Sequence, residues 1–171
     1  MFNPQFWFKK KNLPDFSKVK LFATDVDGVL TDGKIIFSDE GVQYKNFNVK
    51  DGLGIKLLLE HKIQVAILTA SKSPAIIQRA NNLGIQIVLT GLTDKLAALH
   101  EVCQNLQIST AEVAYIGDDV NDIATIKTVG VGCCVADAHP QVKAIASYIT
   151  TNPGGAGAVR EICDRILAGK N

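Results

Sequence analysis

The stretch LFATDVDGVLTDG, residues 21–33, decides how this chain of 171 residues folds. Its first four residues are apolar or β-branched and favour a buried strand. Two carboxylates, Asp25 and Asp27, follow directly, and Gly28 allows the chain to turn. A strand that ends in acidic residues is typical of a parallel sheet, in which ligands bind beyond the carboxyl ends of the strands.

Similar short apolar runs recur along the chain and alternate with helical patterns. This alternation predicts an α/β fold, a Rossmann-like parallel sheet with flanking helices, because near-continuous apolar runs are typical of strands buried on both faces. The predicted strands span residues 19–24, 64–68, 86–89, 113–116, 131–135 and 148–150. The predicted helices span residues 52–61, 73–83, 95–106 and 156–167. The second of these helices has Ser73 as its N-cap and Pro74 in its first turn.

One segment breaks the alternation of strands and helices. Residues 34–38 and 42–48, joined by Asp39-Glu40-Gly41, predict a β-hairpin that projects after the first strand. No repeat or Pro/Gly/Ser-rich linker divides the chain. We therefore predict one domain at residues 19–171, preceded by an N-terminal extension at residues 1–18.

The bulk composition argues against several classes of function. The formal net charge is +1, which provides no field to attract nucleic acid or an acidic membrane. Four cysteines without C-x-x-C spacing favour reduced thiols and a cytoplasmic protein. The N-terminus is aromatic and then basic, the reverse of a secretory signal, and its apolar stretch is too short to span a bilayer. We expect Phe6, Trp7 and Phe8 to dock on the domain or on a neighbouring subunit, with a weak interfacial anchor as the alternative.

Polar residues follow three of the predicted strands. Asp25 and Asp27 follow the first, Thr69 follows the second, and Asp118 follows the strand that leads into GDDVND. Because parallel strands end at a common edge, we expect these side chains to converge. Crowded carboxylates repel one another, and an all-oxygen site with room for water suits Mg²⁺. The alternatives are a simple turn for the two first carboxylates and an ordinary β-branched strand residue for Thr69.

Lys95 is a further candidate because it lies in the first turn of the helix that begins after Asp94. A cation in this position opposes the helix dipole by roughly 0.3–1 kcal/mol, so a phosphate or carboxylate partner is expected. An ordinary surface lysine is the alternative. We expect Asp122 to orient Lys95 and Asp119 to lie behind the ligands of the ion.

Together these motifs resemble those of the haloacid dehalogenase superfamily, with DVDGVLTDG as the first motif and GDDVND as the fourth. The resemblance implies that Asp25 attacks phosphorus and becomes an aspartyl-phosphate, while Asp27 serves as acid for the leaving group and then as base for water. It implies that Thr69 and Lys95, the second and third motifs, hold the phosphoryl oxygens. It also implies that Asp25, Asp118 and the backbone carbonyl of Asp27 hold Mg²⁺.

The intervals between Asp25, Thr69 and Lys95 hold only the hairpin, two helices and a strand, so no separate cap domain fits between them. An uncapped site is open to water, so the substrate must be selected by residues outside the site itself. We expect a subunit interface, with the hairpin packed against a neighbour, to supply it.

From about residue 20 to residue 167, the chain is similar to a subgroup of the superfamily that removes phosphate from an eight-carbon sugar acid for lipopolysaccharide assembly. The similarity includes FNVKDGLGIK, VADAHP and GGAGAVREICD, and it implies a Mg²⁺-dependent homotetramer. A sugar acid with a carboxylate and a phosphate needs cations to bind it. The resemblance implies substrate contacts by Asp27, Asn48, Val49, Lys50, Asp51, Gly52, Lys56, Ser71, Arg79, Lys95 and Asn121.

This chain departs from the subgroup at two positions. The subgroup usually has Thr/Ser-Gly-Arg after the second strand, where this chain has Thr69-Ala70-Ser71, and Lys50 stands where Arg is frequent. Lys72 would compensate only as a point charge. The alternatives are therefore a phosphatase of a nine-carbon sugar acid 9-phosphate and a non-catalytic assembly domain of this fold. A signalling receiver domain is disfavoured, because a stable phosphoryl group is incompatible with an acid/base such as Asp27.

The segment GGAGAVRE lacks the G-K-[ST] ending of a nucleotide-binding loop, so we expect no nucleotide there. The resemblance implies that it closes over active sites in the tetramer, and a flexible lead into the last helix is the alternative. His139 is expected to be a loop or capping residue.

Overall fold

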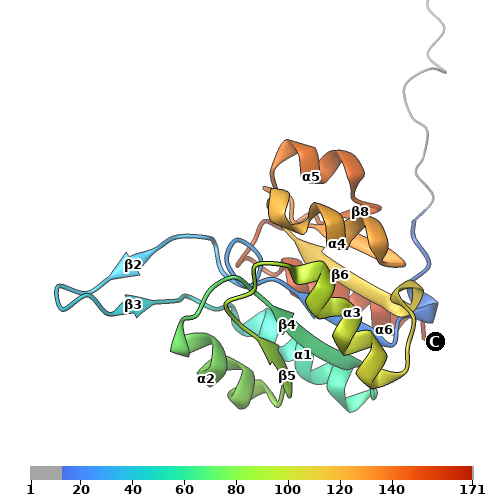
Figure 1. The fold of residues 1–171 in the computed structure, drawn as a ribbon, viewed down its shortest axis with the longest axis horizontal. Coiled ribbons are helices and arrows are strands. Elements are labelled where there is room, and N and C mark those ends of the chain that lie inside the picture. Colours follow the sequence, from blue (N-terminus) through green and yellow to red (C-terminus); the bar gives the residue numbers. More distant parts are fainter. Residues whose placement is uncertain (1–12, 171) are drawn as a thin grey trace, which may run out of the picture.

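A six-stranded parallel sheet with the strand order β5-β4-β1-β6-β7-β8 forms the centre of the protein (Figure 1). The computed structural model describes residues 13–170, so the expected docking of Phe6, Trp7 and Phe8 lies outside the described residues. The α/β fold is confirmed, and each predicted strand is found to within two residues at either end. The strands are β1 Leu21–Thr24, β4 Gln64–Leu68, β5 Ile87–Leu89, β6 Val113–Gly117, β7 Val131–Cys134 and β8 Tyr148–Ile149.

The register of the sheet brings three strand ends to one edge. Thr24 at the end of β1 lies beside Ile67 of β4 on one side and Ile116 of β6 on the other. All residues of β1 and β6 are buried, because helices cover both faces of the sheet. The segments that follow β1, β4 and β6 therefore leave the sheet next to one another.

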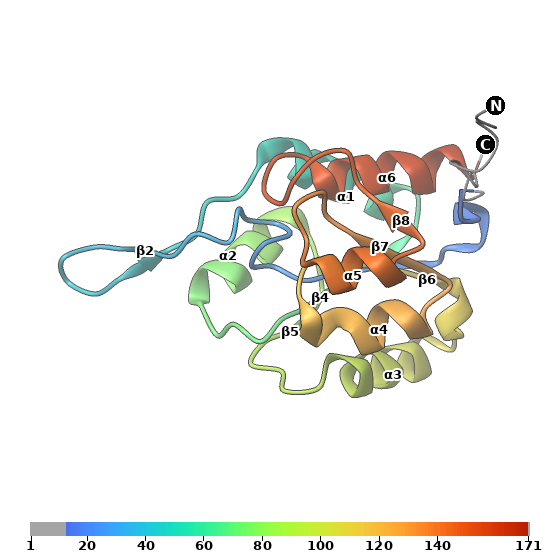
Figure 2. The same cartoon turned by 90° about the horizontal axis from the view of Figure 1, so that it is seen from above.

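The helices form a layer on each face of the sheet. Figure 2 shows α1 and α6 side by side on one face, with α3 and α4 on the opposite face. The helices are α1 Val49–Glu60, α2 Pro74–Leu83, α3 Lys95–Leu106, α4 Ile123–Thr128, α5 Pro140–Ile145 and α6 Ala158–Ala168. None of the helices within residues 13–170 is long and apolar enough to cross a membrane.

The helix predictions differ from the structure at a few points. Helix α1 begins three residues earlier than predicted, because the Asn48 side chain accepts a hydrogen bond from the Lys50 N–H and caps the helix. Ser73 is the N-cap of α2 but makes no side-chain capping bond. Helices α4 and α5 were not predicted, because each has only six residues and too short an apolar pattern.

The predicted hairpin is present, but its strands are short. β2 Ile36–Phe37 pairs antiparallel with β3 Gln43–Tyr44, and the segments on both sides of these pairs are irregular. Figures 1 and 2 show that the hairpin extends well away from the sheet and its helices. It carries the exposed side chains Ile35, Ile36, Phe37, Val42 and Tyr44.

Candidate active site

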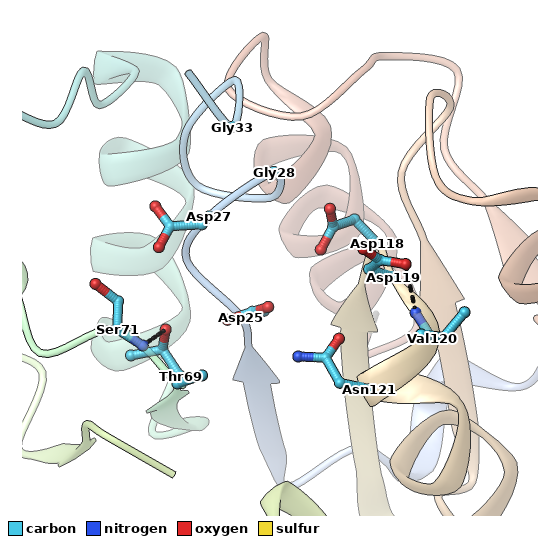
Figure 3. A pocket seen from close by; sticks show the side chains of 11 residues that line it. Asp25, Asp27, Gly28, Gly33, Thr69, Ser71, Asp118, Asp119, Val120 and Asn121 are labelled. Carbon is cyan, nitrogen blue, oxygen red and sulfur yellow. Dashed lines mark hydrogen bonds between the residues drawn. The ribbon is translucent and has the colours of Figure 1, made fainter. Parts of the chain in front are cut away.

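A cavity of about 300 Å³ opens at the edge where β1, β4 and β6 end (Figure 3). The loops after these strands form its walls. The residues that line the cavity are Asp25, Asp27, Gly28, Gly33, Thr69, Ala70, Ser71, Asp118, Asp119, Val120 and Asn121. Residues that are far apart in the sequence thus meet in one place.

Asp25 lies at the floor of this cavity, immediately after β1. Its Oδ1 accepts a hydrogen bond of 2.7 Å from the Val26 N–H, and its Oδ2 lies 2.6 Å from the Lys95 Nζ. Burial raises the pKa of Asp25 to about 6; the charge of Lys95 opposes this rise and the charge of Asp122 adds to it. The carboxylate is therefore fixed in orientation by two different donors.

Lys95 is the first residue of α3, and Asp94 caps that helix by accepting a bond from the Ala97 N–H. The Lys95 Nζ lies 2.6 Å from Asp25 Oδ2 and 2.6 Å from Asp122 Oδ1. Burial alone would lower the pKa of Lys95, but the charges of Asp25 and Asp122 outweigh it and leave the pKa above its ordinary value. The alternative of an ordinary surface lysine is wrong.

Asp122 is fully buried and organises the wall of the cavity. Besides the Lys95 ammonium, its Oδ1 accepts a bond of 2.6 Å from the Tyr115 hydroxyl. Its Oδ2 accepts bonds from the backbone N–H groups of Asp118 at 3.0 Å and Asp119 at 3.3 Å. Each oxygen thus accepts from two donors, and Asp122, unlike Asp25 and Asp118, does not line the cavity, which agrees with a role in orienting Lys95 rather than in binding an ion.

Three carboxylates meet around this point, since oxygen atoms of Asp25, Asp118 and Asp122 all lie within 4.8 Å of one another. Burial, followed by the charges of Asp25 and Asp122, raises the pKa of Asp118 to about 7. Lys95 brings a single positive charge to the three groups. A hard divalent cation fits a donor set made only of oxygen atoms, and Asp25 and Asp118 are the carboxylates best placed to hold it.

Gly28 keeps this acidic cluster close together. Its φ angle is +79°, and a Cβ at this position would lie only 2.1 Å from the Asp118 Oδ2. Any side chain at residue 28 would displace the Asp118 carboxylate.

Asp27 lies higher on the wall, and its side chain is 45% exposed. In Figure 3 its carboxylate points away from Asp118, toward the side of the cavity where Ser71 lies. It forms an ion pair with Lys45, which follows β3 on the return strand of the hairpin. Lys45 was not predicted from the sequence, because a single lysine in VQYKNF carries no signal that distinguishes it from a surface charge.

Thr69, Ser71 and Asn121 line the same cavity. The Thr69 Oγ1 accepts a hydrogen bond of 3.1 Å from the Ser71 N–H, which fixes the turn after β4. Figure 3 shows Thr69 and Ser71 on one side of Asp25 and Asn121 on the other. Ser71 thus occupies the wall at the position where the resembled subgroup usually has an arginine.

The remaining residues expected to bind substrate do not line this cavity. They are Asn48, Val49, Lys50, Asp51, Gly52, Lys56, Arg79 and also Lys95, which is buried against Asp25 and Asp122. Val49 and Lys50 are exposed in the first turn of α1, and Lys56 lines a separate surface depression beside Glu60 and Asn81.

Several members of that group support the structure at the base of the hairpin. The Arg79 guanidinium donates a bond of 3.1 Å to the Asn48 carbonyl and lies over the Phe47 ring, 5.7 Å from its centroid. A Cβ at Gly52 would lie 2.4 Å from the Arg79 Nη2, so the glycine makes room for this arginine. Asp51 is buried and accepts a bond of 2.7 Å from the Arg160 N–H at the start of α6.

The GGAG segment before α6 packs against the loop that follows β1. The Gly155 N–H donates to the Val29 carbonyl at 2.9 Å, and the Asn48 side-chain amide donates to the Gly155 carbonyl at 3.0 Å. Gly154 approaches the Gly28 carbonyl so closely that a Cβ would lie 1.8 Å from its oxygen. These contacts hold the segment against the loop that follows β1 and against the N-cap of α1. His139 caps α5 by accepting from the Gln141 N–H, as expected.

Comparison with known proteins identifies the class to which this arrangement belongs. A family model described as haloacid dehalogenase-like hydrolase matches residues 71–162, more than half of the chain. A curated relative from Yersinia pestis, the 3-deoxy-D-manno-octulosonate 8-phosphate phosphatase KdsC, is 46% identical over 151 residues, which are 88% of this chain and 81% of the relative. The chain therefore belongs to the haloacid dehalogenase-like hydrolases.

Solved structures extend the similarity to phosphatases of the same name. A Moraxella catarrhalis 3-deoxy-D-manno-octulosonate 8-phosphate phosphatase, crystallised with a magnesium ion, a phosphate ion and a KDO molecule, has a TM-score of 0.90 and 43% identity. The alignment covers 92% of this chain and 90% of that one. The Yersinia pestis phosphatase has a TM-score of 0.91 and 43% identity, with 94% and 87% of the two chains covered.

Proposed function

We propose that this protein is a Mg²⁺-dependent phosphomonoesterase that hydrolyses 3-deoxy-D-manno-octulosonate 8-phosphate to the free sugar acid and phosphate. The observation that carries the proposal is the meeting of the Asp25 and Asp118 carboxylates, within 4.8 Å, beside a lysine that orients Asp25. The names of the relatives support the substrate. This activity would serve lipopolysaccharide biosynthesis in the cytoplasm.

In the first step, an oxygen of Asp25 attacks the phosphorus atom. The bond between phosphorus and the sugar oxygen breaks, Asp27 gives its proton to that oxygen, and the phosphoryl group remains on Asp25 as an aspartyl-phosphate. The bonds from the Val26 N–H and the Lys95 ammonium hold Asp25 in one orientation, which lowers the entropic cost of the attack.

In the second step, the ionised Asp27 takes a proton from a water molecule that attacks the same phosphorus atom. Inorganic phosphate leaves and the Asp25 carboxylate is regenerated, so the two steps together consume one water. The Thr69 hydroxyl and the Lys95 ammonium would stabilise the phosphoryl oxygens. Asp25, Asp118 and the Asp27 backbone carbonyl would hold Mg²⁺, which supplies charge neutralisation for the nucleophile and the phosphoryl group.

We further propose a homotetramer in which the hairpin of one chain covers the cavity of another. Ile35 and Phe37 are 67% and 61% exposed on the hairpin, which is unusual for large apolar side chains that no other chain covers. In one chain the expected substrate contacts Lys50 and Arg79 lie outside the cavity. A neighbouring chain would therefore contribute the remaining cations for the sugar acid.

The decisive test is the Asp25→Asn variant, assayed for phosphate release from a panel of sugar phosphates with and without Mg²⁺. We expect phosphate release to fall by roughly 10³-fold or more, because an amide is a poor nucleophile, while the circular dichroism spectrum is unchanged. Full activity in this variant would refute the nucleophile. The panel includes a nine-carbon sugar acid 9-phosphate, since Ser71 leaves more room in the wall than an arginine would, and a higher kcat/KM for that ester would replace the proposed substrate.

A further inference from the structure

The hairpin contributes a charged side chain to the active site through Lys45. The Lys45 Nζ forms an ion pair with the Asp27 Oδ1, although 18 positions separate the two residues in the chain. The Lys45 side chain is only 4% exposed, and the side chain of Asp27 is 45% exposed. An ammonium group removed from water in this way needs a fixed acceptor, and the Asp27 Oδ1 is that acceptor.

A second ion pair near the start of the hairpin provides a comparison. Lys34 Nζ lies 2.8 Å from Asp32 Oδ2, but these side chains are 76% and 36% exposed. Such surface pairs contribute roughly 0–1 kcal/mol and hold their side chains loosely. Burial of the Lys45 side chain, in contrast, restricts the positions that its ammonium group can take.

The segment that carries Lys45 is anchored to the body of the protein. Two residues further on, Phe47 lies under the Arg79 guanidinium of α2. The next residue, Asn48, accepts from Arg79 through its carbonyl and donates to the Gly155 carbonyl through its side chain. The reach of Lys45 is therefore set by the anchored base of the hairpin and not by its projecting tip.

We propose that Lys45 is a positioning residue that fixes the carboxylate of Asp27 for proton transfer, an inference that rests on the proposed role of Asp27. With Oδ1 held by Lys45, rotation of the carboxylate is restricted and Oδ2 is the oxygen that exchanges a proton with the sugar oxygen or with water. Proton transfer requires heavy atoms within about 2.6–3.2 Å, so a carboxylate that rotates freely would spend less time in a productive position.

The way in which kcat/KM depends on the leaving group distinguishes a positioning role of Lys45 from a general structural role. The kcat/KM value reports the steps up to departure of the leaving group. A sugar alkoxide must be protonated as it leaves, whereas p-nitrophenolate is stable as an anion and needs no acid. A misplaced Asp27 therefore lowers kcat/KM for the sugar acid phosphate and spares kcat/KM for p-nitrophenyl phosphate.

The experiment compares Lys45→Met, Lys45→Arg and Lys34→Met with the parent protein, at saturating Mg²⁺, on both esters. For Lys45→Met we expect kcat/KM for the sugar acid phosphate to fall by about 10–100-fold, part of the 10²–10⁴-fold that acid catalysis supplies. The value for p-nitrophenyl phosphate should change by less than about threefold. Lys45→Arg, which keeps the charge, should recover part of the lost activity, and Lys34→Met should resemble the parent on both esters.

Asp27→Asn, alone and combined with Lys45→Met, separates failure of this inference from failure of the proposed function. If Asp27→Asn does not discriminate between the two esters, the acid role of Asp27 is wrong. If it discriminates but Lys45→Met lowers both esters equally or neither, only the positioning role is overturned. A further loss in the double variant would likewise overturn it, because Lys45 would then contact the substrate directly. If Lys45→Met has a lower melting temperature than the parent, Lys45→Gln replaces it and is compared with Lys45→Arg. The test is again the ratio of kcat/KM for the sugar acid phosphate to kcat/KM for p-nitrophenyl phosphate.

Discussion

The cavity floor and the hairpin differ in how many of their side chains find partners within the same chain. At the floor, Asp122 and Lys95 are buried and bonded to each other and to residues at the ends of β1 and β6. On the hairpin, Ile35 and Phe37 face outward, and only two residue pairs join its strands. The difference supports the proposal made above, in which one chain would set the phosphoryl chemistry and a second chain would complete the surface that selects the sugar.

The largest expected effect concerns the floor, at Lys95. Lys95→Met leaves Asp25 and Asp122 without their common counter-ion, and breaking a buried pair costs about 3–5 kcal/mol of unfolding free energy. We expect kcat/KM for phosphate release to fall by roughly 10³-fold, because the nucleophile also loses its orientation. Urea denaturation and steady-state kinetics measure the two effects.

The matched control for this variant is Lys20→Met. Lys20 also forms a close ion pair, 2.6 Å from Glu112, but its side chain is 62% exposed. Its loss should cost less than about 1 kcal/mol. Equal costs for the two variants would contradict the view that the floor is completed within one chain.

The next effect concerns the hairpin. Phe37→Asp places a charge on a surface that we expect to be buried between chains, and a desolvated charge without a partner opposes assembly. Light scattering should show dissociation, and kcat/KM for the sugar acid phosphate should fall by about 10–100-fold, which corresponds to about 1.4–2.8 kcal/mol. Hydrolysis of p-nitrophenyl phosphate should fall less. An intact assembly with unchanged selectivity would show that the hairpin has no such role.

The third effect is the pH dependence of stability at the floor. Burial raises the pKa of Asp25 to about 6 and that of Asp118 to about 7, above the ordinary value of 3.8. Their contribution to stability is therefore complete below about pH 4 and is lost as the pH rises through about 6 to 7. In EDTA the melting temperature should therefore fall as the pH rises from about 4 to about 7.

Adding Mg²⁺ extends this measurement of melting temperature against pH, because the ion binds the ionised carboxylates. The increase in melting temperature on adding Mg²⁺ should be several degrees larger at about pH 8 than at about pH 5. Asp118→Asn should reduce the increase at pH 8. An equal increase at both pH values would place the ion elsewhere.

The smallest effect concerns Ser71, which lines the wall between floor and hairpin. Ser71→Arg adds a guanidinium that can bind a carboxylate or phosphate with two hydrogen bonds. We expect KM for the sugar acid phosphate to fall by about 3–10-fold with kcat within about twofold. An increase in KM would indicate that the wall needs the open space that a serine leaves.

Much of the sheet could be predicted from the sequence, because the strands are buried on both faces and appear as apolar runs. The end of β4 at Leu68 and both ends of α3 agree with the prediction. The convergence of Asp25, Thr69 and Asp118 follows from the parallel topology alone. Short elements are harder to predict, because tertiary contacts and not local preference determine their lengths. Helix α4 was not predicted, and the strands of the hairpin were predicted longer than they are.

The contacts of single charged residues were harder to predict. Lys95 could be identified because a lysine at the start of a helix is unfavourable without an anion nearby. Lys45 had no such signal, since its partner Asp27 lies 18 positions away across a loop. Arg79 and Asp51 were expected to contact substrate, yet within one chain they bond to Asn48 and Arg160. Family resemblance indicates which residues matter, and the fold determines what each one touches.

The close packing of Gly154 and Gly155 against Gly28 and Val29 has a consequence for biosynthesis. These glycines lie directly ahead of α6, so they leave the ribosome after every strand of the sheet has emerged. A nascent chain that ends before them already contains the residues of the acidic cluster. The loop that follows Asp25 still lacks the contacts that Gly154 and Gly155 make with it. Support of this loop therefore depends on residues that are translated after Ile149, the last residue of the sheet.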